Sequence, residues 1–143
     1  AFEAVIETSA PPHLVWEQLT NPLLRVLWQK HVTGVKPQAD GRMGVGNVNN
    51  CMHGEDVTIE HVADWRPFTY ITTRYEAEGF GDPKALGFTY QLEELESGTR
   101  LTTRIQSPGE EPWAAIGEGL SAITAENTEH LRVLLDEAAV PHA

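Results

Sequence analysis

A long amphipathic segment at the end of the chain constrains the fold more than any other feature of the sequence. From Trp113 onward, apolar residues recur at helical spacing with small residues between them: Ile116, Leu120, Ile123, Leu131, Leu134 and Ala138. This spacing puts one apolar stripe along a helix. Because the stripe mixes bulky and small side chains, the helix can lie across a curved sheet without filling the space beneath it.

The chain ahead of this helix alternates polar and apolar residues between turn residues, a pattern typical of antiparallel strands. A strand is expected over Phe2–Thr8, followed by two short helices, the first capped by Ser9 and the second starting at Asn21-Pro22 and ending near Trp28. Six further strands are expected at 31–36, 45–53, 57–64, 68–76, 85–94 and 99–107. Short connections predict an antiparallel meander, whose open face only the C-terminal helix is long enough to cover.

Composition limits the class of protein. The 143 residues suit one domain over 1–143, and the hydrophobic fraction of 41% is ordinary for a globular protein. A net charge of −11 disfavours binding to nucleic acid or to anionic lipid. No apolar run approaches the roughly 20 residues that span a bilayer, so membrane insertion is not expected. The single cysteine, Cys51, excludes an internal disulfide and fits a reducing, cytoplasmic location. A monomer or a homodimer is expected.

Several local motifs follow one another in a recognisable order: Val5–Pro11 with Val15-Trp16, Asn21-Pro22 with Trp28, Gly41–Gly46, and Gly98–Leu101. Together they resemble the START-like, or SRPBCC, superfamily, which includes birch-pollen-allergen-like proteins, polyketide cyclases and ATPase-activator-like proteins. The resemblance covers essentially the whole chain. It implies an α+β helix-grip fold, in which a curved antiparallel sheet of about seven strands wraps around the C-terminal helix with a cavity between them.

A narrower likeness involves Asn50–Gly54 followed by Asp64–Phe68. It is similar to "H-C-x-H-G…D-W-x-P-F" stretches in bacterial members of the superfamily. Asn50 stands where His is more usual, which disfavours a His–Cys–His set of metal ligands.

Cys51 and His53 stand two residues apart on an expected strand, so their side chains point to the same face. They could supply a nucleophile and a base, or two zinc ligands. Only His61 is an obvious third ligand. Lone cysteines and strand histidines more often have no chemical role, so pocket lining is favoured, and no metal or cofactor is predicted.

The expected ligand site combines flat apolar surface with a few polar groups. Phe88 and Tyr90 alternate with polar neighbours and should share the covered face. The full set of predicted ligand-binding residues is Cys51, His53, Tyr70, Phe88, Tyr90, Thr103, Trp113 and Leu120. The acidic pairs, among them Asp136-Glu137, are interpreted as solvated charges.

Three functions are compatible with these features. The first is binding of a small apolar ligand that is aromatic, polyketide or lipid-like. The second is a reaction of the polyketide cyclase or dehydratase kind, for which His53 is the candidate base and Tyr70 or Tyr90 the hydrogen-bond donor. The third is a regulatory interaction domain of a longer chain, with a neighbouring domain or protein as partner, which the start at Ala1 rather than Met mildly favours.

Overall fold

The computed structural model describes residues 2–29, 32–37, 45–46, 48–53, 56–77, 86–106 and 113–138. Its elements in chain order are β1 (Phe2–Thr8), α1 (Pro12–Thr20), the 3-10 helix η1 (Arg25–Leu27), β2 (Gly34–Pro37), β3 (Val48–His53), β4 (Asp56–Arg66), β5 (Tyr70–Ala77), β6 (Leu86–Leu95), β7 (Gly98–Gln106) and α2 (Trp113–Ala138). The predicted α+β order is confirmed, except that the second short helix is reduced to a single 3-10 turn.

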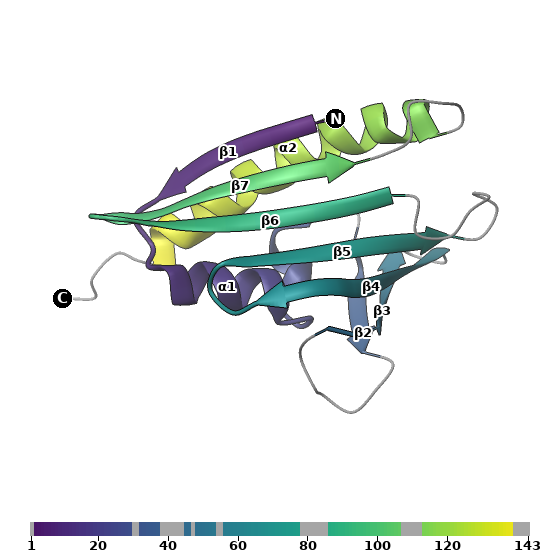
Figure 1. Ribbon diagram of the computed structural model, residues 1–143, viewed down its shortest axis with the longest axis horizontal. Coiled ribbons are helices and arrows are strands. Elements are labelled where there is room, and N and C mark those ends of the chain that lie inside the picture. The colour runs from purple at the N-terminus through teal and green to yellow at the C-terminus, as the bar shows by residue number, and fades with distance from the viewer. Residues whose placement is uncertain are drawn as a thin grey trace.

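All seven strands form one antiparallel sheet in the order β1-β7-β6-β5-β4-β3-β2 (Figure 1). Strands β2 to β7 make the expected meander, because each pairs with the next along the chain. Strand β1 pairs with β7 and so forms the edge opposite β2. Helix α2 packs along β1 and β7, while α1 contacts β6 and β7.

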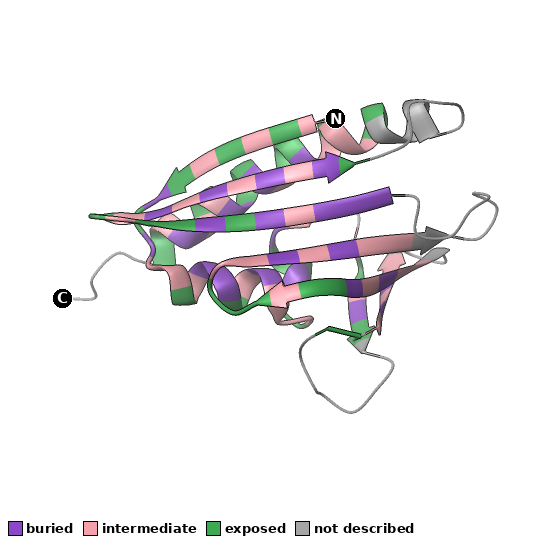
Figure 2. Ribbon diagram, in the orientation of Figure 1, coloured by how far each residue is buried: buried purple, intermediate pink, exposed green. Residues whose placement is uncertain are grey.

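One face of the sheet is buried, and we call it the inner face. On β6 the inner-face residues are Leu86, Phe88, Tyr90 and Leu92, and on β7 they are Leu101, Thr103 and Ile105 (Figure 2). The polar residues between them point to the other, outer face. The predicted alternation on both strands is therefore confirmed, and it fixes which side chains a molecule on the inner face would meet.

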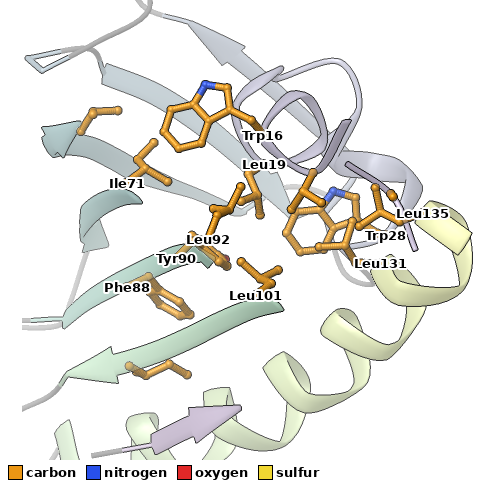
Figure 3. Close-up of a cluster of buried hydrophobic side chains, with 14 of the residues drawn as sticks. Trp16, Leu19, Trp28, Ile71, Phe88, Tyr90, Leu92, Leu101, Leu131 and Leu135 are labelled. Atoms are coloured by element: carbon orange, nitrogen blue, oxygen red, sulfur yellow. The ribbon is translucent and has the colours of Figure 1, made fainter. Parts of the chain in front are cut away.

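Three segments together cover the inner face. Trp16 of α1 packs edge-on against Trp65 of β4, with ring centroids 4.9 Å apart. Figure 3 shows α1 and α2 side chains meeting those of the sheet in one cluster, to which α2 contributes Leu131 and Leu135. Trp28, just after η1, completes the cluster. The two short helical segments thus bury large aromatic side chains of their own and cover the inner face together with α2.

The buried stripe of α2 differs from the predicted one. Within residues 118–138 of α2, whose side chains the structure describes, the buried residues are Thr124, Thr128, Leu131 and Leu135, while Leu120 and Leu134 are partly buried and Ala138 is exposed. Thr128 can be buried because its hydroxyl donates to the Thr124 carbonyl oxygen at 2.9 Å. A purely apolar pattern does not identify such residues. Among the described residues, no helix is long and apolar enough to cross a membrane.

Asp136 near the end of α2 holds the end of β1, although the sequence pattern suggested a solvated charge. Its Oδ1 accepts hydrogen bonds from the Thr8 hydroxyl at 2.6 Å and from the Ser9 backbone N–H at 3.0 Å. The prediction that Ser9 caps α1 is therefore wrong. Pro11 occupies the cap position, and it makes no side-chain capping bond.

We expect Asp136→Ala to lower the free energy of unfolding by about 1–2 kcal/mol, because it removes charge-assisted hydrogen bonds from a partly exposed group. Burial would raise the pKa of Asp136, but the bonds from Thr8 and Ser9 outweigh it and lower the pKa. This stabilisation is therefore present at neutral pH and is lost as the pH falls through the folded-state pKa. Urea unfolding at neutral and acidic pH measures both effects. The control is Glu137→Ala at the neighbouring exposed position, and equal losses for the two variants would contradict the assignment.

Candidate functional site

A buried ion pair lies on the inner face beneath η1. Arg25 of η1 donates from Nη2 to Oε1 of Glu60 on β4 at 2.5 Å, and the two side chains are only 4% and 2% exposed. Charged side chains are rarely buried to this extent unless they are paired. The pair connects the segment after α1 to the middle of the sheet.

Two neighbouring strands complete the hydrogen bonding of Glu60. The strand register places Asn49 of β3 and Tyr75 of β5 on either side of it. Asn49 Nδ2 donates to Glu60 Oε1 at 3.0 Å, and the Tyr75 hydroxyl donates to Oε2. Burial alone would raise the pKa of Glu60, but Arg25 and these hydrogen bonds hold it below the ordinary value. Glu60 is therefore ionised at neutral pH, as is Arg25.

Four aromatic side chains continue from this network across the inner face, and we call them the aromatic row: Tyr75, Phe88, Tyr90 and Trp28. Successive ring centroids lie 5.2 Å apart for Tyr75 and Phe88, 6.5 Å for Phe88 and Tyr90, and 6.5 Å for Tyr90 and Trp28. These separations are typical of contacting aromatic rings. Phe88 and Tyr90 stack, while Tyr75 and Trp28 meet them edge-to-face, so the row provides a continuous aromatic surface that begins next to Glu60.

Several buried polar atoms around the aromatic row have no hydrogen-bond partner among the described residues. Two are the hydroxyls of Thr73 and Thr103. Two others are Arg25 Nε and Asn49 Oδ1, next to Glu60, and the fifth is Gln18 Oε1 on α1. Leaving a buried polar group unsatisfied costs about 1–3 kcal/mol, so each such atom requires an explanation such as a bound water or ligand.

The predicted ligand-binding residues are only partly brought together. Phe88, Tyr90, Thr103 and Cys51 are all buried on the inner face, and Leu120 packs against the same core. The structure therefore gathers five of the eight predicted residues around the inner face.

Tyr70 is not among them. It is adjacent to buried Ile71 on β5, so its side chain points to the outer face, where its hydroxyl donates to Asp64 Oδ2 at 3.1 Å. The alternation of the strand excludes it from a site that includes Tyr90. The side chains of His53 and Trp113 lie outside the described part of the structure.

The buried thiol and phenol of the site hold their protons at neutral pH. Burial, reinforced by the charge of Glu60, raises the pKa of Cys51 to about 12. Burial also raises the pKa of Tyr90 to about 12. Cys51 is therefore a poor nucleophile, and Tyr90 can donate a hydrogen bond but cannot act as a base. Within the described part of the chain, no three His, Cys, Asp or Glu residues are grouped to hold a metal ion.

A curved antiparallel sheet closed by a long C-terminal helix, with aromatic side chains on the enclosed face, defines a START-like helix-grip protein. The predicted resemblance to this superfamily is confirmed. The chain belongs to the family of Activator of Hsp90 ATPase homolog 1-like proteins, whose family model matches residues 9–135. Among curated proteins, none matches the sequence.

Solved structures show the same fold at low sequence identity. The Aha1 dimer from Colwellia psychrerythraea is 16% identical with a TM-score of 0.75, over 94% of this chain and 95% of that one. Protein MLL2253 from Mesorhizobium loti is 24% identical with a TM-score of 0.72, over 94% and 97%. DynU16 of the dynemicin biosynthetic locus is 19% identical with a TM-score of 0.73, over 96% of this chain but only 47% of its own length.

Proposed function

We propose that the protein binds a small, mainly apolar molecule on the inner face, against the aromatic row and beneath α1, η1 and α2. One observation carries this proposal. The hydroxyls of Thr73 and Thr103 are buried without a partner, and the strand register places Thr73 beside Phe88 and Thr103 beside Tyr90. Polar groups on both sides of an aromatic wall suit a ligand that is held by apolar contact and oriented by a few hydrogen bonds.

The protonation of the site supports binding rather than acid–base turnover. Cys51 and Tyr90 both keep their protons at neutral pH. Glu60 is ionised, but its two oxygens are already engaged by three donors, so it is poorly suited to remove a proton from a substrate. Of the other two predicted catalytic groups, Tyr70 points to the outer face, where its hydroxyl donates to Asp64, and the role of His53 as a base stays a prediction.

We expect Tyr90→Ala to weaken binding of a neutral aromatic probe, 2-naphthol, by about tenfold or more, because it removes the centre of the aromatic row. Isothermal titration measures the affinity, and circular dichroism checks that the variant is folded. The matched control is Tyr70→Ala, which removes the same side chain from the outer face and should leave the affinity unchanged. Equal affinities for the two variants would contradict the proposed site.

A second variant keeps the test decisive if Tyr90→Ala does not fold. Thr103→Val replaces the unpartnered hydroxyl with a methyl group of similar size. The variant should fold, and its free energy of unfolding should be at least that of the native protein. It should still weaken binding of a ligand that uses the hydroxyl. Native mass spectrometry of protein purified from its own host should further detect a co-purified small molecule.

A further inference from the structure

Two of the unpartnered atoms form a complementary pair at one end of the aromatic row. Arg25 Nε is a hydrogen-bond donor and Asn49 Oδ1 is an acceptor, and both residues are buried, with 3% and 4% of their surface exposed. Both side chains are held by the same atom, because Arg25 Nη2 and Asn49 Nδ2 donate to Glu60 Oε1 at 2.5 and 3.0 Å. The free donor and the free acceptor therefore both belong to side chains of the hydrogen-bond network around Glu60.

The charge of this cluster is already balanced. The positive charge of Arg25 is paired with the negative charge of Glu60, and the neighbouring Asn49 and Tyr75 are neutral. A ligand carboxylate placed here would find no uncompensated cation and would be repelled by Glu60 in a region of low dielectric. A ligand ammonium group would compete with Arg25 for Glu60 and could not accept a hydrogen bond from Nε. Only an uncharged group that both donates and accepts fits the pair.

We propose that the ligand of the inner face has an uncharged head group, a hydroxyl or a primary amide, that accepts a hydrogen bond from Arg25 Nε and donates one to Asn49 Oδ1. Its apolar body then lies along the aromatic row, which begins at Tyr75. This inference rests on the proposed function, because it assigns the polarity of a ligand at that same site. It predicts that the protein selects alcohols, phenols or amides over fatty or aromatic acids of the same size.

Three probes with the same ring system test this selectivity on the native protein. They are naphthalene, 2-naphthol, which is neutral at neutral pH, and 2-naphthoate, which is an anion. We expect 2-naphthol to bind about tenfold or more tightly than either of the other two, as measured by isothermal titration, because only it satisfies both free atoms.

The substitution Asn49→Leu then assigns the preference to this cluster. It removes the free acceptor, so the affinities for 2-naphthol and naphthalene should converge while naphthalene binding persists. The control is Asn50→Leu, on the adjacent residue whose side chain points to the outer face, and it should preserve the preference. Arg25→Lys provides a second variant, since it keeps the charge beside Glu60 but removes the Nε donor.

The outcomes separate this inference from the proposed function. If none of the three probes binds, the proposed function fails. If 2-naphthoate binds as tightly as 2-naphthol, or naphthalene matches 2-naphthol in the native protein, the inner face binds apolar molecules but the inference of a neutral head group is overturned. The affinities of the three probes for the native protein test the neutral head group even if a variant does not fold.

Discussion

Glu60→Gln is expected to lower the free energy of unfolding by about 3–5 kcal/mol, which is the usual effect of removing one partner of a buried ion pair. Glutamine has nearly the same volume, but Asn49 and Tyr75 donate to different oxygens of Glu60, and the single amide oxygen of glutamine can accept from only one of them. What it cannot provide is the negative charge that compensates Arg25, whose side chain is 4% exposed. The uncompensated guanidinium would then remain in the protein interior, and this makes the folded state less stable. Urea unfolding followed by circular dichroism measures the loss.

A surface ion pair provides the matched control for this prediction. Glu7 of β1 contacts Arg100 of β7 at 2.9 Å, but the two side chains are 57% and 40% exposed. Glu7→Gln should therefore cost less than about 1 kcal/mol. The double variant Arg25→Met/Glu60→Leu should recover most of the stability lost in Glu60→Gln, because it removes both charges together. Similar losses for Glu60→Gln and Glu7→Gln would show that the ion pair is not buried as described.

The pH dependence of stability provides an independent test of the ion pair between Arg25 and Glu60. Since the pKa of Glu60 lies below its ordinary value of 4.5 in the folded protein, its contribution is complete at neutral pH and is lost as the pH falls through the folded-state pKa. In the Glu60→Gln variant this part of the acid sensitivity should be absent. Stability measured between neutral and acidic pH should therefore fall less steeply for the variant than for the native protein.

Gly98→Ala is expected to destabilise the protein by about 3 kcal/mol or more. Gly98 begins β7 with a φ of +148°, a conformation that residues with a side chain rarely adopt. A Cβ atom at this position would lie 1.9 Å from the Thr8 carbonyl oxygen and 2.9 Å from the Ser9 Cα. Both are backbone atoms at the end of β1, so neither can move without disturbing the strand that packs against α2.

Gly119 in α2 is the control for this substitution. It is exposed, and a Cβ atom there would meet nothing within 4 Å. Gly119→Ala should therefore stabilise the protein by about 0.5–1 kcal/mol, since alanine is the better helix former. Thermal and urea unfolding of both variants should show opposite changes. If Gly98→Ala were as stable as the native protein, the close approach of β7 to the end of β1 would be contradicted.

The fold could be predicted from local patterns because each element shows its own periodicity. Alternation on β6 and β7 placed Phe88, Tyr90 and Thr103 on the inner face, and this placement is confirmed. Tyr70 was predicted as a ligand-binding residue for its hydroxyl and ring, without an alternation argument, and it lies on the outer face. The sequence does not show which of the two alternating sets on β5 is buried, and the aromatic residue next to Ile71 is the one on the outer face.

The ion pair could not be predicted, because the segment around η1 reverses the usual rule of burial. In the run from Leu23 to Leu27, Arg25 is buried, whereas Leu23 and Leu27 are 79% and 58% exposed. A pattern based on hydrophobicity instead predicts that Leu23 and Leu27 are buried and that Arg25 is exposed. The one available indication was Glu60, a charged residue on the same strand face as buried Val62. Its partner is 35 residues away, and local periodicity carries no information on such a distance.

Mapping a bound probe by NMR shows whether a small molecule binds between the sheet and its covering helices. In protein with labelled methyl groups and saturating 2-naphthol, we expect intermolecular nuclear Overhauser effects from the probe to the methyls of Thr73 and Thr103. Contacts confined to the exposed Leu23 and Leu27 would place the probe on the outside of the protein and would rule out binding at the inner face.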